Sequence, residues 1–428
     1  MGESAAALPV LLDERLGMKS IRSYVGWLVT GAGALALASC GGGSSNSSSM
    51  TAAASTASTT STTSTTSSSV FTPTALVSNI PSNTAIQDAN LQNGWGIAFG
   101  PSNDVWVNDH GSNVSTLYDG KGNVDPLVVS IPAAANSTAS GPTGIIFNST
   151  TSFNVATNGT AQPASFIFAG TGGTIAGWSA PAAGALPSTT ATTMFDSTTG
   201  TNPPDVFYGL AQVTNTSGNF LLAADAAGNG SVDVFAQSPT NSSMLTTATL
   251  QGSFTDPNLP ANYKPFNVAV INHQVYVTYT QFNGTKFLTG ANLGLIDVYD
   301  ENGNFLKRLT TGGALNAPWG MALAPASFGI FSNDLIVGNF GDGKMNVYDP
   351  TTGAFLGTIS DSNGNPIVFQ GLWGMAFGNN DQNQPSNTLF YASGPTQQTG
   401  VYGSVTLGAA QAATTAAPPA AAPVSITY

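Results

Sequence analysis

Charged residues, and glutamate above all, are scarce in this sequence. They make up 7% of its 428 residues, and glutamate occurs only as Glu3, Glu14 and Glu301. Glutamate favours helix interiors, whereas the more frequent aspartate favours turns and caps, so the imbalance argues against a helical protein. With 49 Gly and 25 Pro, the composition predicts an all-β protein of many short strands joined by tight turns.

Basic residues are also few, with nine Lys and Arg against 21 Asp and Glu and a net charge of −12. Nucleic-acid binding needs clustered Lys and Arg that replace counterions, so nucleic acid is excluded as a partner. Acidity keeps an exported protein soluble. The alternative interpretation is an acidic ligand-binding face.

The single cysteine, Cys40, excludes an intrachain disulfide. It follows Lys19, Arg22 and an apolar run over 24–37. That run is too short to cross a bilayer of ~30 Å and is typical of a signal peptide. Leu37-Ala38-Ser39-Cys40 resembles the bacterial lipobox, which implies lipidation of Cys40. An ordinary signal peptide that contains a cysteine is the alternative.

These features divide the chain into four parts. The signal covers 1–40, and Met18 is a more usual signal start than Met1. The Ser/Thr/Gly-rich segment 41–70 lacks the apolar surface to offset chain entropy, so we expect a flexible tether. The globular part is 71–408, and 409–428 is an Ala/Pro-rich tail. Gly41 resembles an outer-membrane sorting residue, so we expect an exported protein anchored by lipid, at the outer membrane.

One phrase recurs six times in the globular part: an aromatic or small residue, a Gly or Asn, and a short apolar strand. It begins at Trp95, Thr143, Tyr208, Phe266, Trp319 and Trp373. A second strand follows each phrase, and alternating third strands bounded by Asp-Gly or Asn-Gly turns carry the hairpin signature. Four short antiparallel strands per unit are typical of propeller blades. The pattern predicts a six-bladed β-propeller with four-stranded blades.

The two ends of the repeat complement each other. The sixth unit has a third strand over 400–407 but no fourth, and an orphan strand over 74–78 precedes the first unit. We expect the orphan to close the last blade as its outer strand, which removes an exposed edge. A pair of β-sandwiches or an open solenoid is the alternative architecture.

Several passages carry a family resemblance. "VNDHG" and "VGNFGDG" resemble NHL-type propellers and their lactonase-like and streptogramin-lyase-like relatives. "LQNGWGIAFGPSNDVWVNDHGSNVSTLYDGKG", "FTDPNLPANYKPFNVAVI", "LNAPWGMALAPASFGIFSNDLIVGNFGDGKMNVYDPTTGAFLGTI" and "GLWGMAFGN" more closely resemble an uncharacterised family of exported bacterial propellers. The resemblance covers nearly all of 71–407. The resemblance implies a propeller fold and export, and it implies no enzymatic activity.

The candidate site residues follow the second strands, which in an NHL-like blade open onto one rim of the channel: Asn108, Asp109, His110, Asp225, Asn339 and Asp342. An oxygen-rich ring there would suit Ca²⁺ or a sugar-like or peptide ligand. Asn and Asp also cap turns, which is the structural alternative. A zinc site is excluded, because two histidines fall short of the usual three protein ligands.

The remaining candidate residues do not indicate a particular reaction or ligand. His273 lies at an expected hairpin tip, and Glu301, the residue a lactonase-like metal set would need, lies in an expected exposed turn. Trp95, Trp319 and Trp373 share one repeat position, which indicates core packing or the aromatic walls of a pocket. No phosphate loop or Gly-x-Ser-x-Gly elbow is found.

The sequence therefore predicts a lipid-anchored binding or scaffold protein of the cell envelope, with a protein or glycan partner. The alternative is a Ca²⁺-dependent hydrolase or lyase with Asp109, His110, Asp225 and Asn339 at the channel mouth. Nothing in the sequence selects between an enzyme and a binding protein.

Overall fold

The computed structural model describes residues 69–408 except 82, 158–159, 184 and 201–203. Its strands form six main sheets. The first three blades, each from its inner to its outer strand, are β3(Gly94–Ala98), β4(Val105–Asp109), β5(Val114–Tyr118), β6(Val129–Ser130); β7(Pro142–Phe147), β10(Phe166–Gly170), β11(Thr174–Trp178), β12(Thr192–Asp196); and β13(Phe207–Asn215), β14(Gly218–Asp225), β15(Ser231–Gln237), β16(Leu245–Thr247).

The last three blades are β17(Tyr263–Ile271), β18(Gln274–Gln281), β19(Leu295–Tyr299), β20(Phe305–Thr311); β21(Pro318–Leu323), β22(Leu335–Asn339), β23(Met345–Tyr348), β24(Phe355–Thr358); and β25(Leu372–Phe377), β26(Leu389–Thr396), β27(Thr399–Leu407), β1(Phe71–Ser78). A short strand, β2(Ile86–Gln87), pairs with β1 in parallel. Two 3₁₀ turns, η1(Ser197–Thr199) and η2(Gly329–Phe331), are the only helical elements in the described part of the chain.

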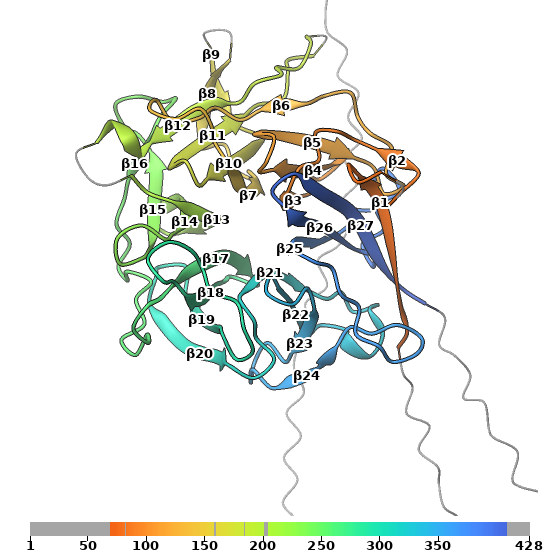
Figure 1. Ribbon diagram of the computed structural model, residues 1–428. Coiled ribbons are helices and arrows are strands. Elements are labelled where there is room, and N and C mark those ends of the chain that lie inside the picture. The colour runs from red at the N-terminus through yellow and green to blue at the C-terminus, as the bar shows by residue number, and fades with distance from the viewer. Residues whose placement is uncertain (1–68, 82, 158–159, 184, 201–203, 409–428) are drawn as a thin grey trace, which may run out of the picture. The chain divides into compact units, whose positions relative to one another are not determined.

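The inner strands form a closed ring. Contacts run from β3 to β7, β13, β17, β21, β25 and back to β3, and the blades radiate from this ring (Figure 1). The predicted six-bladed propeller of four-stranded blades is thus confirmed. An extra hairpin in the second blade, β8(Asn154–Thr157) and β9(Thr160–Pro163), lies within the longest spacing of the repeat, 65 residues from Thr143 to Tyr208.

The blades are held together by apolar layers. The middle strands β4, β10, β19 and β22 are buried at every residue, because both faces of a blade pack on neighbouring blades. Six buried clusters lie one at each blade-to-blade contact. Burial of this apolar surface is the main stabilising contribution to the ring.

The Gly of the repeated phrase marks the closest approach of adjacent inner strands. A Cβ added at Gly374 would lie 2.5 Å from the carbonyl oxygen of Trp95 on the next inner strand. Only a residue without a side chain fits there unless the backbone shifts. The fourth phrase has Asn267 instead, and its Nδ2 donates a hydrogen bond of 2.7 Å to the carbonyl oxygen of Trp319.

The sixth blade joins the two ends of the described chain. β1 pairs antiparallel with β27, from Phe71 opposite Leu407 to Ser78 opposite Val401. This is the pairing expected of the orphan strand. It leaves β27 paired on both sides, with β1 and β26.

The remaining sequence predictions concern other parts of the chain. The signal, Cys40, most of the tether and the tail lie outside the described residues. Among the residues that are described, no helix has the length and apolar character to cross a membrane.

Candidate functional site

Aromatic rings fill one end of the central channel. The side chains at the first position of the phrase meet here: the rings of Trp95 and Trp373 stack with centroids 3.5 Å apart, and Trp319 contacts both edge-on. These tryptophans are 4–5% exposed and belong to one buried cluster with Phe266 and Phe287. Because rings from non-neighbouring blades touch, we name this cluster the aromatic plug.

The channel beyond the plug is a cavity of about 940 Å³. Its walls come from all six inner strands, starting at Trp319 of the plug and ending at the hairpin that contains Asn272 and His273. The third position of the phrase supplies a ring of apolar residues: Ile97, Ile145, Leu210, Val268, Met321 and Met375. The cavity is therefore closed at the plug and opens at the opposite rim.

A few polar groups lie toward the open end. Gln212 on β13 lines the cavity, and its buried Oε1 has no hydrogen-bond partner among the described residues. Glu301, in the turn between β19 and β20, also lines it, with a side chain that is 22% exposed. His273 Nδ1 lies 3.1 Å from Glu301 Oε1, with a side chain 91% exposed. His273 is thus at a solvated hairpin tip, as expected, but the Glu301 side chain is largely buried.

The predicted rim residues lie at the other end of the channel, around the plug. Asn108 is fully buried on β4, and its Nδ2 donates to the carbonyl oxygens of Thr143 and Gly144 on the second blade. Asp109, also fully buried, accepts a hydrogen bond from Thr116 Oγ1 at 2.8 Å. Burial raises the pKa of Asp109 well above its ordinary value.

His110 follows Asp109 and packs against the plug. Its ring lies 4.8 Å from that of Trp95, and its Nε2 is 3.3 Å from Thr171 Oγ1 on the second blade. Burial lowers the pKa of His110 to about 4, so the ring is neutral at pH 7. It is not a cationic group that could attract an anion.

Asn339 and Asp342 form a local network on the fifth blade. Asn339 accepts a hydrogen bond from the Asn316 backbone and donates to the Ala314 carbonyl and to Asp342 Oδ1 at 3.0 Å. Among the described residues, no hydrogen bond, ion pair or ring contact joins Asp109, Asp225 and Asn339 to one another. The predicted set thus occupies blades one, three and five around the plug.

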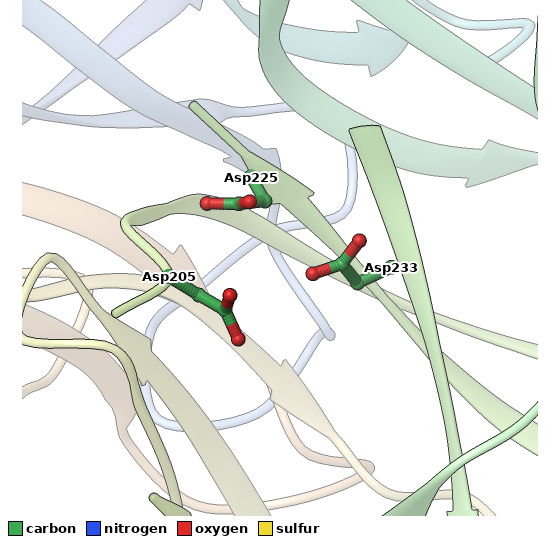
Figure 2. A group of neighbouring side chains, drawn as sticks. All are labelled: Asp205, Asp225 and Asp233. Carbon is green, nitrogen blue, oxygen red and sulfur yellow. The ribbon is translucent and has the colours of Figure 1, made fainter. Parts of the chain in front are cut away.

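Asp225 instead belongs to a group of three aspartates on the third blade, which we name the acidic cluster (Figure 2). Asp205 precedes β13, Asp225 ends β14 and Asp233 lies on β15, and one carboxylate oxygen from each lies within 4.8 Å of the others. Asp225 is 5% exposed, and its Oδ1 accepts hydrogen bonds from the backbone of Val206 and Ala227. No hydrogen bond from the described residues reaches its Oδ2.

The acidic cluster carries unbalanced negative charge. Burial, and then the neighbouring carboxylates, raise the pKa of Asp205 to about 7. Burial likewise raises the pKa of Asp225 to about 6 and raises that of Asp233. The charge of Lys264, whose Nζ donates to the carbonyl oxygens of Ala226 and Gly228, lowers the pKa of Asp225, but by less than burial raises it. The three carboxylates therefore favour either a shared proton or a cation.

Sequence reasoning identified Asp225 but missed Gln212, Asp205, Asp233 and the inward position of Glu301. A signal for Gln212 was present: it occupies the fifth position of the phrase, where the other five units have an apolar residue. No comparable signal marks Asp205 or Asp233. They approach Asp225 only when the third blade folds.

No family model matches the sequence. Two uncharacterized proteins of Acanthamoeba polyphaga mimivirus are similar to it. One is 33% identical over 309 residues, covering 70% of this chain and 72% of that protein. The other is 30% identical over 304 residues, covering 70% and 77%. The chain belongs to the family of these mimivirus proteins. Both relatives are viral proteins, so the bacterial source and the export of this protein stay predictions.

Among solved structures, a streptogramin B lyase is 11% identical with a TM-score of 0.41, covering 79% of this chain and 98% of that one. A virginiamycin B lyase from Staphylococcus aureus is 11% identical with a TM-score of 0.42, covering 79% and 100%. A glucose dehydrogenase is 12% identical with a TM-score of 0.46, covering 79% and 99%. Likeness at this level does not extend to activity.

Proposed function

We propose that the protein is a lipid-anchored, exported binding protein that holds a small molecule in the cavity of its central channel. The observation that carries this proposal is the cavity of about 940 Å³, closed by the aromatic plug at one end and open at the other. Export and anchoring rest on the signal-like segment over 19–40 and on Cys40.

The cavity matches ligand sites in proteins in its concave shape and its volume. Such sites are concave, of roughly 300–1,000 Å³, mostly apolar, and carry a few polar groups that fix orientation. Here the third position of the phrase supplies apolar side chains, and about half of the lining is polar, including Gln212, Asn267 and Glu301. A small molecule would exchange bulk water for these apolar side chains, which favours binding.

The lining supports binding better than hydrolysis. Glycoside hydrolysis needs two opposed carboxylates, and Glu301 is the only carboxylate among the residues that line the cavity. The predicted catalytic set of Asp109, His110, Asp225 and Asn339 lies around the plug, in separate blades. We therefore keep a hydrolase or lyase as the alternative and place binding first.

The test uses N-phenyl-1-naphthylamine, an uncharged apolar dye that fluoresces when it leaves water. We expect saturable binding of one dye per chain. Tryptophans at Ser149 and Thr214, exposed residues that line the cavity, should obstruct the opening and weaken binding about tenfold. The control places tryptophans at Leu306 and Leu356, which are 48% and 46% exposed on outer strands. Absence of saturable binding to the wild-type chain, or equal binding by both double variants, would contradict the proposal.

A second candidate function is Ca²⁺ binding at the acidic cluster. Ca²⁺ takes oxygen ligands at roughly 2.3–2.6 Å, so ligands on opposite sides lie about 5 Å apart. One carboxylate oxygen from each of Asp205, Asp225 and Asp233 lies within 4.8 Å of the other two, which fits this limit. Water would complete the shell. Calorimetric titration of Ca²⁺ into chelator-treated protein should show one site that Asp225→Asn removes, and no binding heat would contradict it.

A further inference from the structure

A second pocket, of about 560 Å³, lies between the first and second blades, and four aromatic residues line it. They are Trp106 on β4, Phe147 on β7, Phe166 on β10 and Trp178 on β11. The ring centroid of Trp106 lies 4.5 Å from that of Phe166 and 4.8 Å from that of Trp178, and Phe147 contacts Phe166 edge-on. Phe147 and Leu127, which also lines the pocket, are only partly buried. The pocket therefore exposes apolar surface that a ligand can reach.

Two carboxylates, those of Asp104 and Asp125, line the same pocket. The register of the first blade places them on one face with Trp106. Asp104 lies directly before β4, two residues ahead of Trp106, and side chains two residues apart on a strand point to the same face. Leu117 on β5 is opposite Trp106, and its carbonyl oxygen accepts a hydrogen bond from the Asp125 backbone. Both aspartates are partly exposed, so a ligand in the pocket can reach them.

These two carboxylates carry negative charge that the pocket does not balance. None of the described residues donates a hydrogen bond to the Asp104 carboxylate, and burial, followed by the charges of Asp125, Asp119 and Asp381, raises its pKa to about 6. Asp125 accepts one hydrogen bond, from the Leu127 backbone at 2.7 Å. Neither Lys, Arg nor His is found among the residues that line the pocket. Above pH 7 the pocket therefore attracts a cation and repels an anion.

We propose that this pocket binds a small organic cation, an ammonium group that carries an apolar substituent. The ammonium group pairs with Asp104, the carboxylate without a hydrogen-bond donor, and Asp125 adds a second negative charge. The substituent lies against Phe147 and Leu127. Aromatic rings attract cations as well as apolar groups, so the carboxylates and the rings favour the same ligand. The site is separate from the one proposed for the central cavity, although Phe147 lines both.

Calorimetric titration at pH 8 and low ionic strength tests the charge preference. Benzylamine, benzyl alcohol and benzoate share one ring and are cationic, neutral and anionic at this pH. We expect benzylamine to bind at one site, about tenfold more tightly than benzyl alcohol, and benzoate not to bind. Because none of the described residues donates to Asp104, Asp104→Asn removes a charge without removing a hydrogen bond. This variant should lose most of the preference for benzylamine over benzyl alcohol.

Asp361→Asn is the matched control for net charge, because it changes a carboxylate that does not line the pocket. It should leave the preference for benzylamine intact. A second pair of variants tests the location. Ala180→Trp, at an exposed residue of the lining, should weaken benzylamine binding about tenfold, whereas Ala354→Trp, at an exposed residue outside the lining, should not.

Equal binding of benzylamine and benzyl alcohol, or equal effects of Asp104→Asn and Asp361→Asn, would overturn the proposal. Loss of benzylamine binding in the chain with tryptophans at Ser149 and Thr214 would also overturn it, because the cation would then lie in the central cavity. The dye titration is independent of these results. Its failure would remove the proposed function and leave the cation pocket standing.

Discussion

Replacing Asp225 by asparagine should stabilise the protein at alkaline pH when Ca²⁺ is absent. The pKa of Asp225 is raised from 3.8 to about 6, first by burial. The folded state therefore binds this proton more tightly than the unfolded state. Below about pH 4, Asp225 is protonated in both states and does not destabilise the fold. The free energy of unfolding falls as the pH rises from 4 to 6, and above pH 6 the buried charge of Asp225 destabilises the folded state by its full amount.

The magnitude follows from the shift. At 1.36 kcal/mol per pKa unit, a rise from 3.8 to about 6 corresponds to roughly 3 kcal/mol. Asp205 and Asp233 are partly exposed, and solvent screens their repulsion. Asparagine keeps an acceptor for the backbone of Val206 and Ala227, but a weaker one. We therefore expect Asp225→Asn to gain about 1–2 kcal/mol at pH 8 and nothing at pH 4.

Urea unfolding, followed by tryptophan fluorescence at both pH values with a chelator present, measures the difference. Asp361→Asn is the control, because Asp361 also accepts two backbone hydrogen bonds, from Asn363 and Asn365, which lower its pKa. That variant should lose stability at pH 8. An Asp225→Asn variant that is less stable than wild type at pH 8 in chelator would refute the reasoning.

Calcium should reverse the order of stability of the wild type and the Asp225→Asn variant. If Ca²⁺ binds the acidic cluster, a concentration 100-fold above the dissociation constant stabilises the folded state by about 2.7 kcal/mol. Asp225→Asn would lose most of this gain. The wild type should then be the more stable protein at pH 8 in Ca²⁺, and an unchanged order would remove the cluster as a Ca²⁺ site.

Three further substitutions test the ring itself. Gly374→Ala forces a Cβ against the next inner strand and should cost about 1–3 kcal/mol. Gly364→Ala, which has open space but a φ of +78°, should cost less, and equal losses in urea unfolding would contradict the close approach. Asn267→Ala leaves a buried carbonyl without its donor and should cost about 1–3 kcal/mol by the same assay; a neutral result would count against that bond. Phe71→Ala removes a side chain that is 1% exposed on β1 and should cost about 3–5 kcal/mol. It should also speed proteolysis near the N-terminal strand, and unchanged cleavage would show that β1 adds little.

The blade pattern could be predicted from the sequence because it is local. Each phrase combines an apolar strand with a Gly, and its period sets the number of blades. The match between a missing strand at one end and an orphan strand at the other predicted the pairing of β1 with β27. Without β1 the last blade would lack the fourth strand that each of the other five blades has, so the repeat itself predicted the pairing.

The site could not be predicted in the same way. Asp109, Asp225 and Asn339 each end the second strand of their blade, but the ring spreads such positions around an axis that the aromatic plug fills. Glu301 lies in a turn that the sequence predicts to be exposed. A hydrogen bond from Asn215 Nδ2 to its carbonyl oxygen holds the turn at the end of β13, and Glu301 lines the cavity.

The sequence by itself thus determined the strands, the six blades and the closure of the last one, because hydrophobic period and turn residues act over neighbouring positions. Only the tertiary structure decided which end of the channel is open and which polar groups meet there or in the acidic cluster. The physical reason is that these contacts join side chains from different strands or blades, and their distances depend on how those strands and blades pack.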